Sequence, residues 1–222
     1  MQIVLQNTMQ TLRPPPKLTI SEWADTYRKL SPESSAESGS WHTSRCEYQR
    51  EIMDTFNNIN IERIVVMTSS QVGKTEILLN AIGYYIDQDA SPMMVVQPNL
   101  TMGQAFSKDR FEHNVKGEGS PISLSIARTK TFFNRKIFMC STPTIKGISA
   151  IESAFEESDQ RYYNVPCPEC NHKQILKWKN VIWDEDKPET AAYACGDCGS
   201  LIEESSKQWM INNGEWIATN AL

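Results

Sequence analysis

The fold is decided by residues 63–86, which read RIVVMTSSQVGKTEILLNAIGYYI. The first five residues form a β-rich, largely apolar run that is typical of a strand buried on both faces. From Ile77 to Ile86, apolar residues recur at helical spacing and form a wide stripe. A short polar turn separates the two runs, so we predict a strand, a turn and a helix.

Further apolar runs extend this unit into a parallel sheet. Residues 93–96 predict a second buried strand, and the order strand, loop, helix, strand is that of one βαβ unit. Residues 136–140 predict a third strand. Helices are predicted at 20–30, behind a capping box formed by Thr19 and Glu22, and at 48–56, 104–115 and 122–133.

The polar turn has the form of a phosphate-binding loop. The usual pattern is Gly-x-x-x-x-Gly-Lys-Ser/Thr, and here Thr68 takes the place of the first glycine. In such a loop backbone N–H groups converge on phosphate oxygens, Lys74 meets the β- and γ-phosphates, and Thr75 offers its hydroxyl to Mg²⁺. The alternative is a chance polar turn capped by Thr75. The candidate nucleotide-binding residues are Ser69, Ser70, Gln71, Val72, Gly73, Lys74 and Thr75.

Four of the six cysteines form two Cys-x-x-Cys pairs that are 24 residues apart: Cys167 and Cys170, then Cys195 and Cys198. Two such pairs are typical of a closed, structural zinc site with four cysteine ligands. The alternative, a redox Cys-x-x-Cys, needs a thioredoxin-like context that the sequence does not show. The two isolated cysteines, Cys46 and Cys140, are predicted to be small buried hydrophobic side chains.

Composition places the chain among ordinary globular proteins, with 40% hydrophobic and 22% charged residues. No apolar run approaches the ~18 residues that cross a bilayer. Residues 1–12 lack the basic start and apolar core of a secretory signal. These features predict a cytosolic protein without membrane association.

The net charge of −5 is unevenly distributed. Residues 105–146 hold eight Lys and Arg against three Asp and Glu, whereas residues 151–222 hold six against thirteen. Because Lys and Arg neutralise phosphates, a DNA-binding surface is predicted in the first stretch. The alternative is that these charges only solvate a loop and a helix face.

The chain divides into three predicted parts. Residues 1–18 are polar, contain three consecutive prolines and predict a flexible leader. Residues 19–160 predict a P-loop ATPase domain, and residues 161–222 predict a zinc-ribbon region. The predicted fold class is therefore α/β, a P-loop NTPase-type parallel sheet with helices on both faces, plus a small four-cysteine zinc ribbon.

Several segments resemble the large terminase subunits of lambda-type tailed phages. They are YQREIMD at 48–54, RIVVM at 63–67, SSQVGKTE at 69–76, RTKTF at 128–132 and STPTIKG at 141–147. The likeness extends through the cysteine region. It implies an ATPase that drives viral DNA into a capsid, with ATP, Mg²⁺ and Zn²⁺ as cofactors. It also implies double-stranded DNA, the terminase small subunit, the capsid portal and further copies of the chain as partners, in the bacterial host cytoplasm.

The resemblance implies roles for four more residues. Tyr48 would stack on the adenine and Gln49 would hydrogen-bond its edge, although Tyr48 as a simple helix anchor is the alternative. Ser141 and Thr142 would couple the state of the γ-phosphate to movement, since hydroxyls at the carboxyl end of a parallel strand lie where ligands bind. The alternative for both is a cap on the next turn.

One element of the family is missing from the sequence. ATP hydrolysis needs an apolar strand that ends in Asp and Glu, and only residues 106–134 could hold it. No apolar run there ends in an acid, so a segment near 115–118 is predicted to be missing. The sequence VIWDE at 181–185 is the one apparent substitute for this acid site, but it lies between the cysteine pairs and is predicted to be a solvated turn instead.

Three functions therefore stay open. The first is the ATPase portion of a terminase large subunit, without the family's C-terminal nuclease domain. The second is a catalytically defective remnant that binds nucleotide or DNA without hydrolysis. The third is a helicase-like P-loop ATPase outside packaging.

Overall fold

The computed structural model of the chain describes residues 17–30, 38–96, 126, 129, 132–143 and 149–220. Nearly all of the predicted leader and all of the predicted helix 104–115 lie outside these residues. Of the helix predicted at 122–133, positions 126 and 129 are helical, and Phe132 lies beyond the helix.

Short elements precede the central strands. Helix α2 (Ile20–Tyr27) begins with the predicted capping box, in which the Thr19 hydroxyl and the Glu22 carboxylate each accept from the other residue's amide. The helix ends before Leu30, because Lys29–Leu30 (β1) pair with Gly39–Ser40 (β2). The 3-10 helix η1 (Thr43–Cys46) and helix α3 (Tyr48–Thr55) follow.

The predicted strand and helix of residues 63–86 are present as β3 (Arg63–Met67) and α4 (Lys74–Asp87). Strand β3 pairs in parallel with β4 (Ile137–Ser141), with Met67 opposite Ser141 at the carboxyl ends. Because both strands end at the same edge, the loops that follow them meet there.

The strand predicted at residues 93–96 is not formed, and that prediction was wrong. The side chains of Met93, Met94, Val95 and Val96 are between 40% and 46% exposed, and no described strand pairs with them. Apolar composition makes a segment suitable for a strand, but a strand forms only where a neighbouring backbone completes its hydrogen bonds. The described part of the parallel sheet has two strands rather than three.

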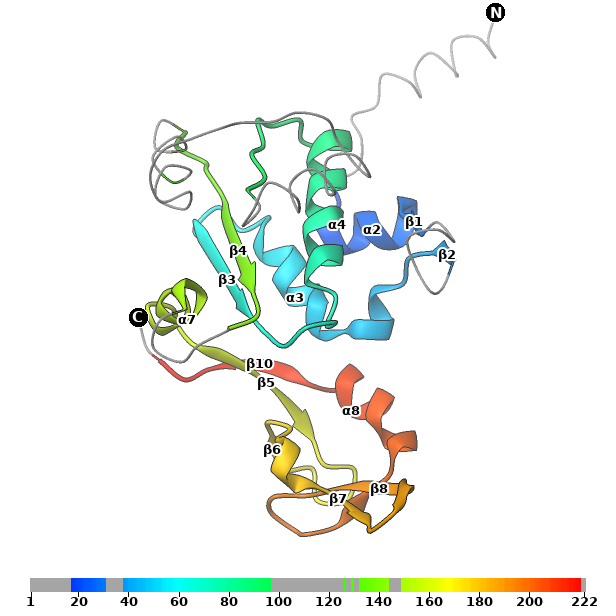
Figure 1. Cartoon of the computed structure of the whole chain (residues 1–222). Helices are drawn as coiled ribbons and strands as arrows, with labels where there is room; N and C mark the ends of the chain where they lie inside the picture. The colour runs from blue at the N-terminus through cyan, green and yellow to red at the C-terminus, as the bar shows by residue number, and fades with distance from the viewer. Residues whose placement is uncertain are drawn as a thin grey trace, which may run out of the picture.

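The main core lies between β3 and the helices on one of its faces. Ile64 and Val66 of β3 are buried together with residues of α2, α3 and α4, among them Met53 and Ile77. Helix α7 (Ala150–Glu156) packs against the other face of the strands (Figure 1). Helices therefore cover both faces of this small sheet, and the fold class is mixed α/β.

Residues 161–220 form two small antiparallel sheets. Strand β5 (Arg161–Pro166) lies between β10 (Glu215–Ala218) and β6 (Lys173–Gln174). The second sheet contains β7 (Val181–Asp184), β8 (Lys187–Ala194) and β9 (Leu201–Ile202). Connections are made by η2 (Trp178–Asn180), η3 (Glu204–Ser206) and α8 (Lys207–Asn212). Within the described ranges, we find no helix with the length and apolarity needed to cross a bilayer.

Candidate nucleotide-binding and metal sites

The predicted phosphate-binding loop joins the end of β3 to the start of α4. Gly73 is the N-cap of α4 and takes a φ of +79°, in the left-handed region that favours glycine. A Cβ at this position would lie 2.3 Å from Nε2 of Gln49, so any larger residue here would have to displace the Gln49 side chain. The first turn of α4 leaves backbone amides without helical partners, and these are the donors that bind phosphate in loops of this kind.

Lys74 links the loop to the end of β4. Its ammonium donates to the carbonyl of Ser69 and, at 3.1 Å, to Oγ1 of Thr142. The amide of Thr68 donates to the carbonyl of Ser141 at 3.3 Å. The two predicted coupling residues are thus brought to the loop. Four loop residues are solvent-exposed: Ser69, Ser70, Gln71 and Thr75.

Tyr48 and Gln49 lie beside the loop, and both are engaged within the protein. Tyr48 Oη and Gln49 Nε2 each donate to the carbonyl of Val72 at 3.2 Å. Burial is the main reason that the pKa of Tyr48 rises to about 12. Gln49 is 2% exposed, and its Oε1 is buried without a hydrogen-bond partner among the described residues. Both residues therefore hold the loop, and Gln49 keeps one unused acceptor.

Glu76, the acid next to the loop, is paired with an arginine that the sequence analysis missed. Arg28, whose side chain is 13% exposed, forms an ion pair with Glu76 and also donates to Asn80. Its guanidinium lies 4.8 Å from the centroid of the Trp41 ring. The pair joins positions 48 residues apart, and no local pattern signals such a contact. Glu76 therefore attaches α4 to the end of α2.

Two basic side chains of the predicted DNA-binding stretch bind other parts of the protein. Arg135 pairs with Glu62 at 2.7 Å, and the Lys136 ammonium donates to the carbonyls of Asn58 and Ile61. Burial lowers the pKa of Lys136. The other Lys and Arg residues of 105–146 lie outside the described residues, so the surface stays a prediction.

The sequence VIWDE at 181–185 contains a strand, so its prediction as a solvated turn was wrong for most of its length. Val181–Asp184 form β7, and Asp184 stands opposite Lys187 across a tight hairpin. The two acids, Asp184 and Glu185, are exposed within the cysteine region. Among the strands that the structure describes, none ends in an acid pair beside the phosphate-binding loop.

The four paired cysteines meet in one cluster. All four Sγ atoms lie within 4.8 Å of one another, with 3.9 Å between Cys167 and Cys198 and 3.8 Å between Cys170 and Cys195. Four tetrahedral zinc–sulfur bonds of about 2.3 Å place the sulfurs about 3.8 Å apart. The cluster therefore has the dimensions of a metal site. The isolated Cys46 and Cys140 are half-buried rather than buried.

Two matching backbone turns present these sulfurs. In the first turn the Cys167 amide donates to the carbonyl of His172, and the Asn171 amide donates to the carbonyl of Cys167, both at 2.9 Å. The turn that begins at Cys195 repeats both hydrogen bonds. Each turn needs one positive φ, which is 60° at Asn171 and 73° at Gly199. The repeated Cys-x-x-Cys spacing is the sequence signal of this geometry.

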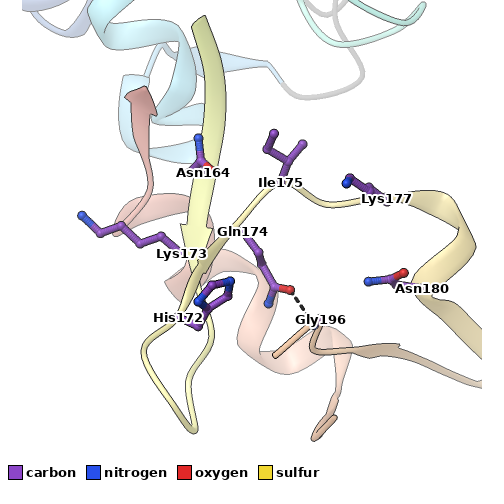
Figure 2. A pocket seen from close by; sticks show the side chains of 8 residues that line it. All are labelled: Asn164, His172, Lys173, Gln174, Ile175, Lys177, Asn180 and Gly196. Carbon is purple, nitrogen blue, oxygen red and sulfur yellow. Dashed lines mark hydrogen bonds between the residues drawn. The ribbon is translucent and has the colours of Figure 1, made fainter. Parts of the chain in front are cut away.

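Two polar side chains around the sulfurs had no signal in the sequence. Gln174, 8% exposed, donates from Nε2 to the sulfur of Cys195 at 3.5 Å. Its Oε1 accepts from the Gly196 amide at 2.9 Å (Figure 2). Ser200 Oγ lies 3.1 Å from the sulfur of Cys198. Such outer hydrogen bonds orient the ligand atoms of a metal site.

The pKa values of Cys167 and Cys170 are shifted in opposite directions. Burial raises the pKa of Cys167, but the amides of Cys170 and Glu169, with Ser200 and Cys195, lower it to about 6. The amide of His172 lowers the pKa of Cys170, but burial and the neighbouring thiols raise it to about 12. Sulfurs this close cannot all become thiolates unless a cation balances them. The cluster is therefore suited to a bound cation.

A pocket of about 250 Å³ is lined by residues of the cysteine region (Figure 2). Its lining includes no residue of the candidate phosphate-binding loop, so we do not take it as the nucleotide site. The lining residues are Asn164, His172, Lys173, Gln174, Ile175, Lys177, Asn180 and Gly196.

A sequence model described as the ATPase domain of the phage terminase large subunit gpA matches residues 35–113 and 108–216. The chain belongs to this terminase family. The matched residues include the phosphate-binding loop, the end of β4 and all four paired cysteines. The two matched segments overlap at residues 108–113 of this chain.

Two curated relatives are named terminase, large subunit. This chain is 27% identical to the protein of Enterobacteria phage P21, in an alignment that covers 93% of this chain and 42% of the relative. It is 26% identical to the protein of Escherichia phage lambda, in an alignment that covers 86% of this chain and 41% of the relative. The chain thus spans about two fifths of the length of these relatives. No solved structure matches it.

Proposed function

We propose that this chain is the ATP-binding part of a phage DNA-packaging motor, and that ATP with Mg²⁺ binds at residues 69–75. The observation that carries the proposal is the Gly73–Thr75 turn at the start of α4, with the Lys74 ammonium beside Thr142. The parallel pairing of β3 and β4, which end at this same point, supports a P-loop NTPase-type sheet.

Each residue of the loop has a role that follows from its position. The free amides at the start of α4 bind phosphate oxygens, and the exposed Thr75 hydroxyl is a Mg²⁺ ligand. Lys74 exchanges its bonds to Ser69 and Thr142 for the β- and γ-phosphates. Because this exchange releases Thr142 at the end of β4, it gives a physical route for the coupling proposed for Ser141 and Thr142.

Tyr48 and Gln49 are proposed to meet the base. The unpaired Oε1 of Gln49 is an acceptor that matches the amino group of adenine. Because Gln49 is 2% exposed, the base reaches this oxygen only if the side chain turns outward and leaves the Val72 carbonyl. Nucleotide binding is then accompanied by a local change at the start of α3.

We propose that the four clustered cysteines bind one structural zinc ion. The fit of the sulfur spacing and the two matching turns support this assignment. The proposed partners are double-stranded DNA, the terminase small subunit, the capsid portal and further copies of the chain, in the bacterial host cytoplasm. The family match and the relatives' name, terminase large subunit, support a role in phage DNA packaging, and the specific partners and location follow from the resemblance alone.

Titration with a fluorescent ATP analogue and Mg²⁺ tests the nucleotide site. Wild-type protein should bind saturably, and Lys74→Ala should bind at least about tenfold more weakly, because it loses a cation at the phosphates. Lys177→Ala is the matched control, since Lys177 is exposed in the cysteine region. Folded wild-type protein that does not bind the analogue would refute the proposal.

A second candidate, nucleotide binding without hydrolysis, is favoured by one observation. No described strand ends in an acid pair beside the loop. Measuring phosphate release with and without double-stranded DNA separates the two candidates. Turnover that is lost in Lys74→Ala supports the motor, and binding without turnover supports the remnant. The helicase-like alternative predicts strand separation, and the family match gives it no support.

A further inference from the structure

Strands β5 and β10, which lie before and after the four cysteines in the sequence, also contact a residue that holds the phosphate-binding loop. Tyr163 of β5 and Trp216 of β10 stand opposite each other in the ladder, with ring centroids 5.2 Å apart. The Tyr163 ring meets the Tyr48 ring edge-on at 6.0 Å, and Trp216 Nε1 donates to the Tyr48 carbonyl at 2.9 Å. In Figure 1 the two strands pass beneath the turn between β3 and α4.

Tyr48 transmits this support to the loop. Its Oη donates to the carbonyl of Val72, which directly precedes Gly73 and Lys74. Gln49, the next residue of α3, donates to the same carbonyl and fills the space beside Gly73. The loop is therefore held at one peptide unit by two adjacent side chains, and one of these residues is held by the cysteine region.

Tyr163 is fixed on its other side by that region. Its Oη donates to the carbonyl of Ile211 in α8 at 2.6 Å. Its ring lies so close to Gly214 that a Cβ there would be 2.6 Å from the ring. It also packs against the buried cluster that contains Cys167 and Cys195. The position of Tyr163 therefore depends on how completely this second core is assembled.

We propose that Tyr163 and Trp216 are positioning residues for the phosphate-binding loop, and that metal binding at the four cysteines raises nucleotide affinity through them. This inference rests on the proposed nucleotide site at residues 69–75. A metal ion draws the two cysteine turns together and completes the core under Tyr163. Linked binding is reciprocal, so nucleotide must raise metal affinity by the same factor.

Among the described residues, two other contacts join the cysteine region to α3 or to the 3-10 helix before it, and neither reaches the loop. Arg161 pairs with Glu51 at 2.6 Å, but both side chains are nearly half exposed, and such pairs contribute little. Gln208 Nε2 donates to the carbonyl of Ser44 at 3.1 Å, in the 3-10 helix before α3. The aromatic contacts are therefore the connection to test.

Hydrogen exchange of the loop tests the positioning role without any nucleotide. In Tyr163→Leu, amides in a peptide covering residues 68–78 should exchange at least about fivefold faster than in wild type, because the loop loses its support. Trp216→Phe keeps an aromatic ring next to Tyr163 but loses the indole N–H that donates to the Tyr48 carbonyl, so it should give a smaller increase in a fully folded protein. Tyr162→Leu is the control, since Tyr162 contacts Phe155 instead. Unchanged loop exchange in both Tyr163→Leu and Trp216→Phe overturns the proposal.

Nucleotide titration before and after zinc removal tests the coupling. Chelation should weaken ATP-analogue binding to wild type by about fivefold or more, the low end of ordinary coupling between sites. The same treatment should change the affinity of Tyr163→Leu by less than about twofold, because the connection is already cut. Equal weakening in both proteins overturns the coupling. A wild type that binds no analogue in either state refutes the nucleotide site instead, and loop exchange still decides the positioning role.

Discussion

Gly73→Ala is the substitution that most directly probes how the loop is built. Alanine at a φ of +79° carries left-handed strain of about 1–2 kcal/mol, partly offset by about 0.4–1 kcal/mol because alanine restricts the unfolded chain. The new methyl would also lie 2.3 Å from Gln49 Nε2. This atom ends a flexible side chain, but Gln49 is 2% exposed, so it moves only by leaving the Val72 carbonyl.

Displacing Gln49 adds the loss of one hydrogen bond and some overpacking, together about 1–2 kcal/mol. We therefore expect Gly73→Ala to lower the free energy of unfolding by about 2–3 kcal/mol in wild type. In a Gln49→Ala background the methyl has room, and only the strain remains, about 1 kcal/mol. The two substitutions should thus couple by at least about 1 kcal/mol.

Urea denaturation of the four proteins, followed by tryptophan fluorescence with zinc present, measures this coupling. The dependence of the unfolding free energy on urea should be the same in all four, so that midpoints report stability. A coupling below about 0.5 kcal/mol, the usual error of additivity, would contradict the packing of Gln49 against Gly73.

Three further predictions concern other parts of the chain. Cys195→Ser should lower the zinc content from about one ion per chain, measured by atomic emission, and a folded protein that keeps its zinc would contradict the metal site. Arg28→Met should lower the free energy of unfolding by about 2 kcal/mol, because Glu76 loses a largely buried partner. Lys207→Ala breaks an exposed pair with Glu204 and should have almost no effect in the same thermal unfolding assay. Similar losses of stability in the two variants would argue against the Arg28 pair. Burial raises the pKa of both Tyr48 and Tyr163 from 10.0 to about 12, so their contribution to stability is complete below pH 10 and is lost as the pH rises toward 12. Absorbance titration at alkaline pH should show that Tyr48→Phe removes a tyrosine that ionises late. Loss of a tyrosine that ionises near pH 10 would contradict this.

The strand, turn and helix of residues 63–86 could be predicted because their geometry is local. Strand, glycine turn and helix each follow from the residues that form them, and the structure has β3 at the predicted residues 63–67. The partner of β3 could not be predicted in the same way. Residues 93–96 and 137–141 are both apolar and β-branched or aromatic-rich, and composition does not say which of them finds a backbone to pair with.

The cysteine cluster was predictable for the same reason, since each Cys-x-x-Cys turn is a closed local unit. Gln174 and Ser200, which contact the sulfurs, were not, because their position depends on how the two turns meet. Tyr48 shows the same limit. Its resemblance to a base-binding residue pointed to one role, whereas contacts with Tyr163 and Trp216 reveal a second one that needs partners more than 100 positions away in sequence.

The pairing of β5 with β10 has a practical consequence for anyone who wishes to shorten this protein. A fragment cut at residue 160, where the sequence changes character, would discard Tyr163 and Trp216 and leave Tyr48 facing water. The gene segment that encodes the nucleotide loop is therefore not a self-sufficient module. A useful minimal version must keep β10, because Trp216 of this strand donates to the Tyr48 carbonyl at the start of α3.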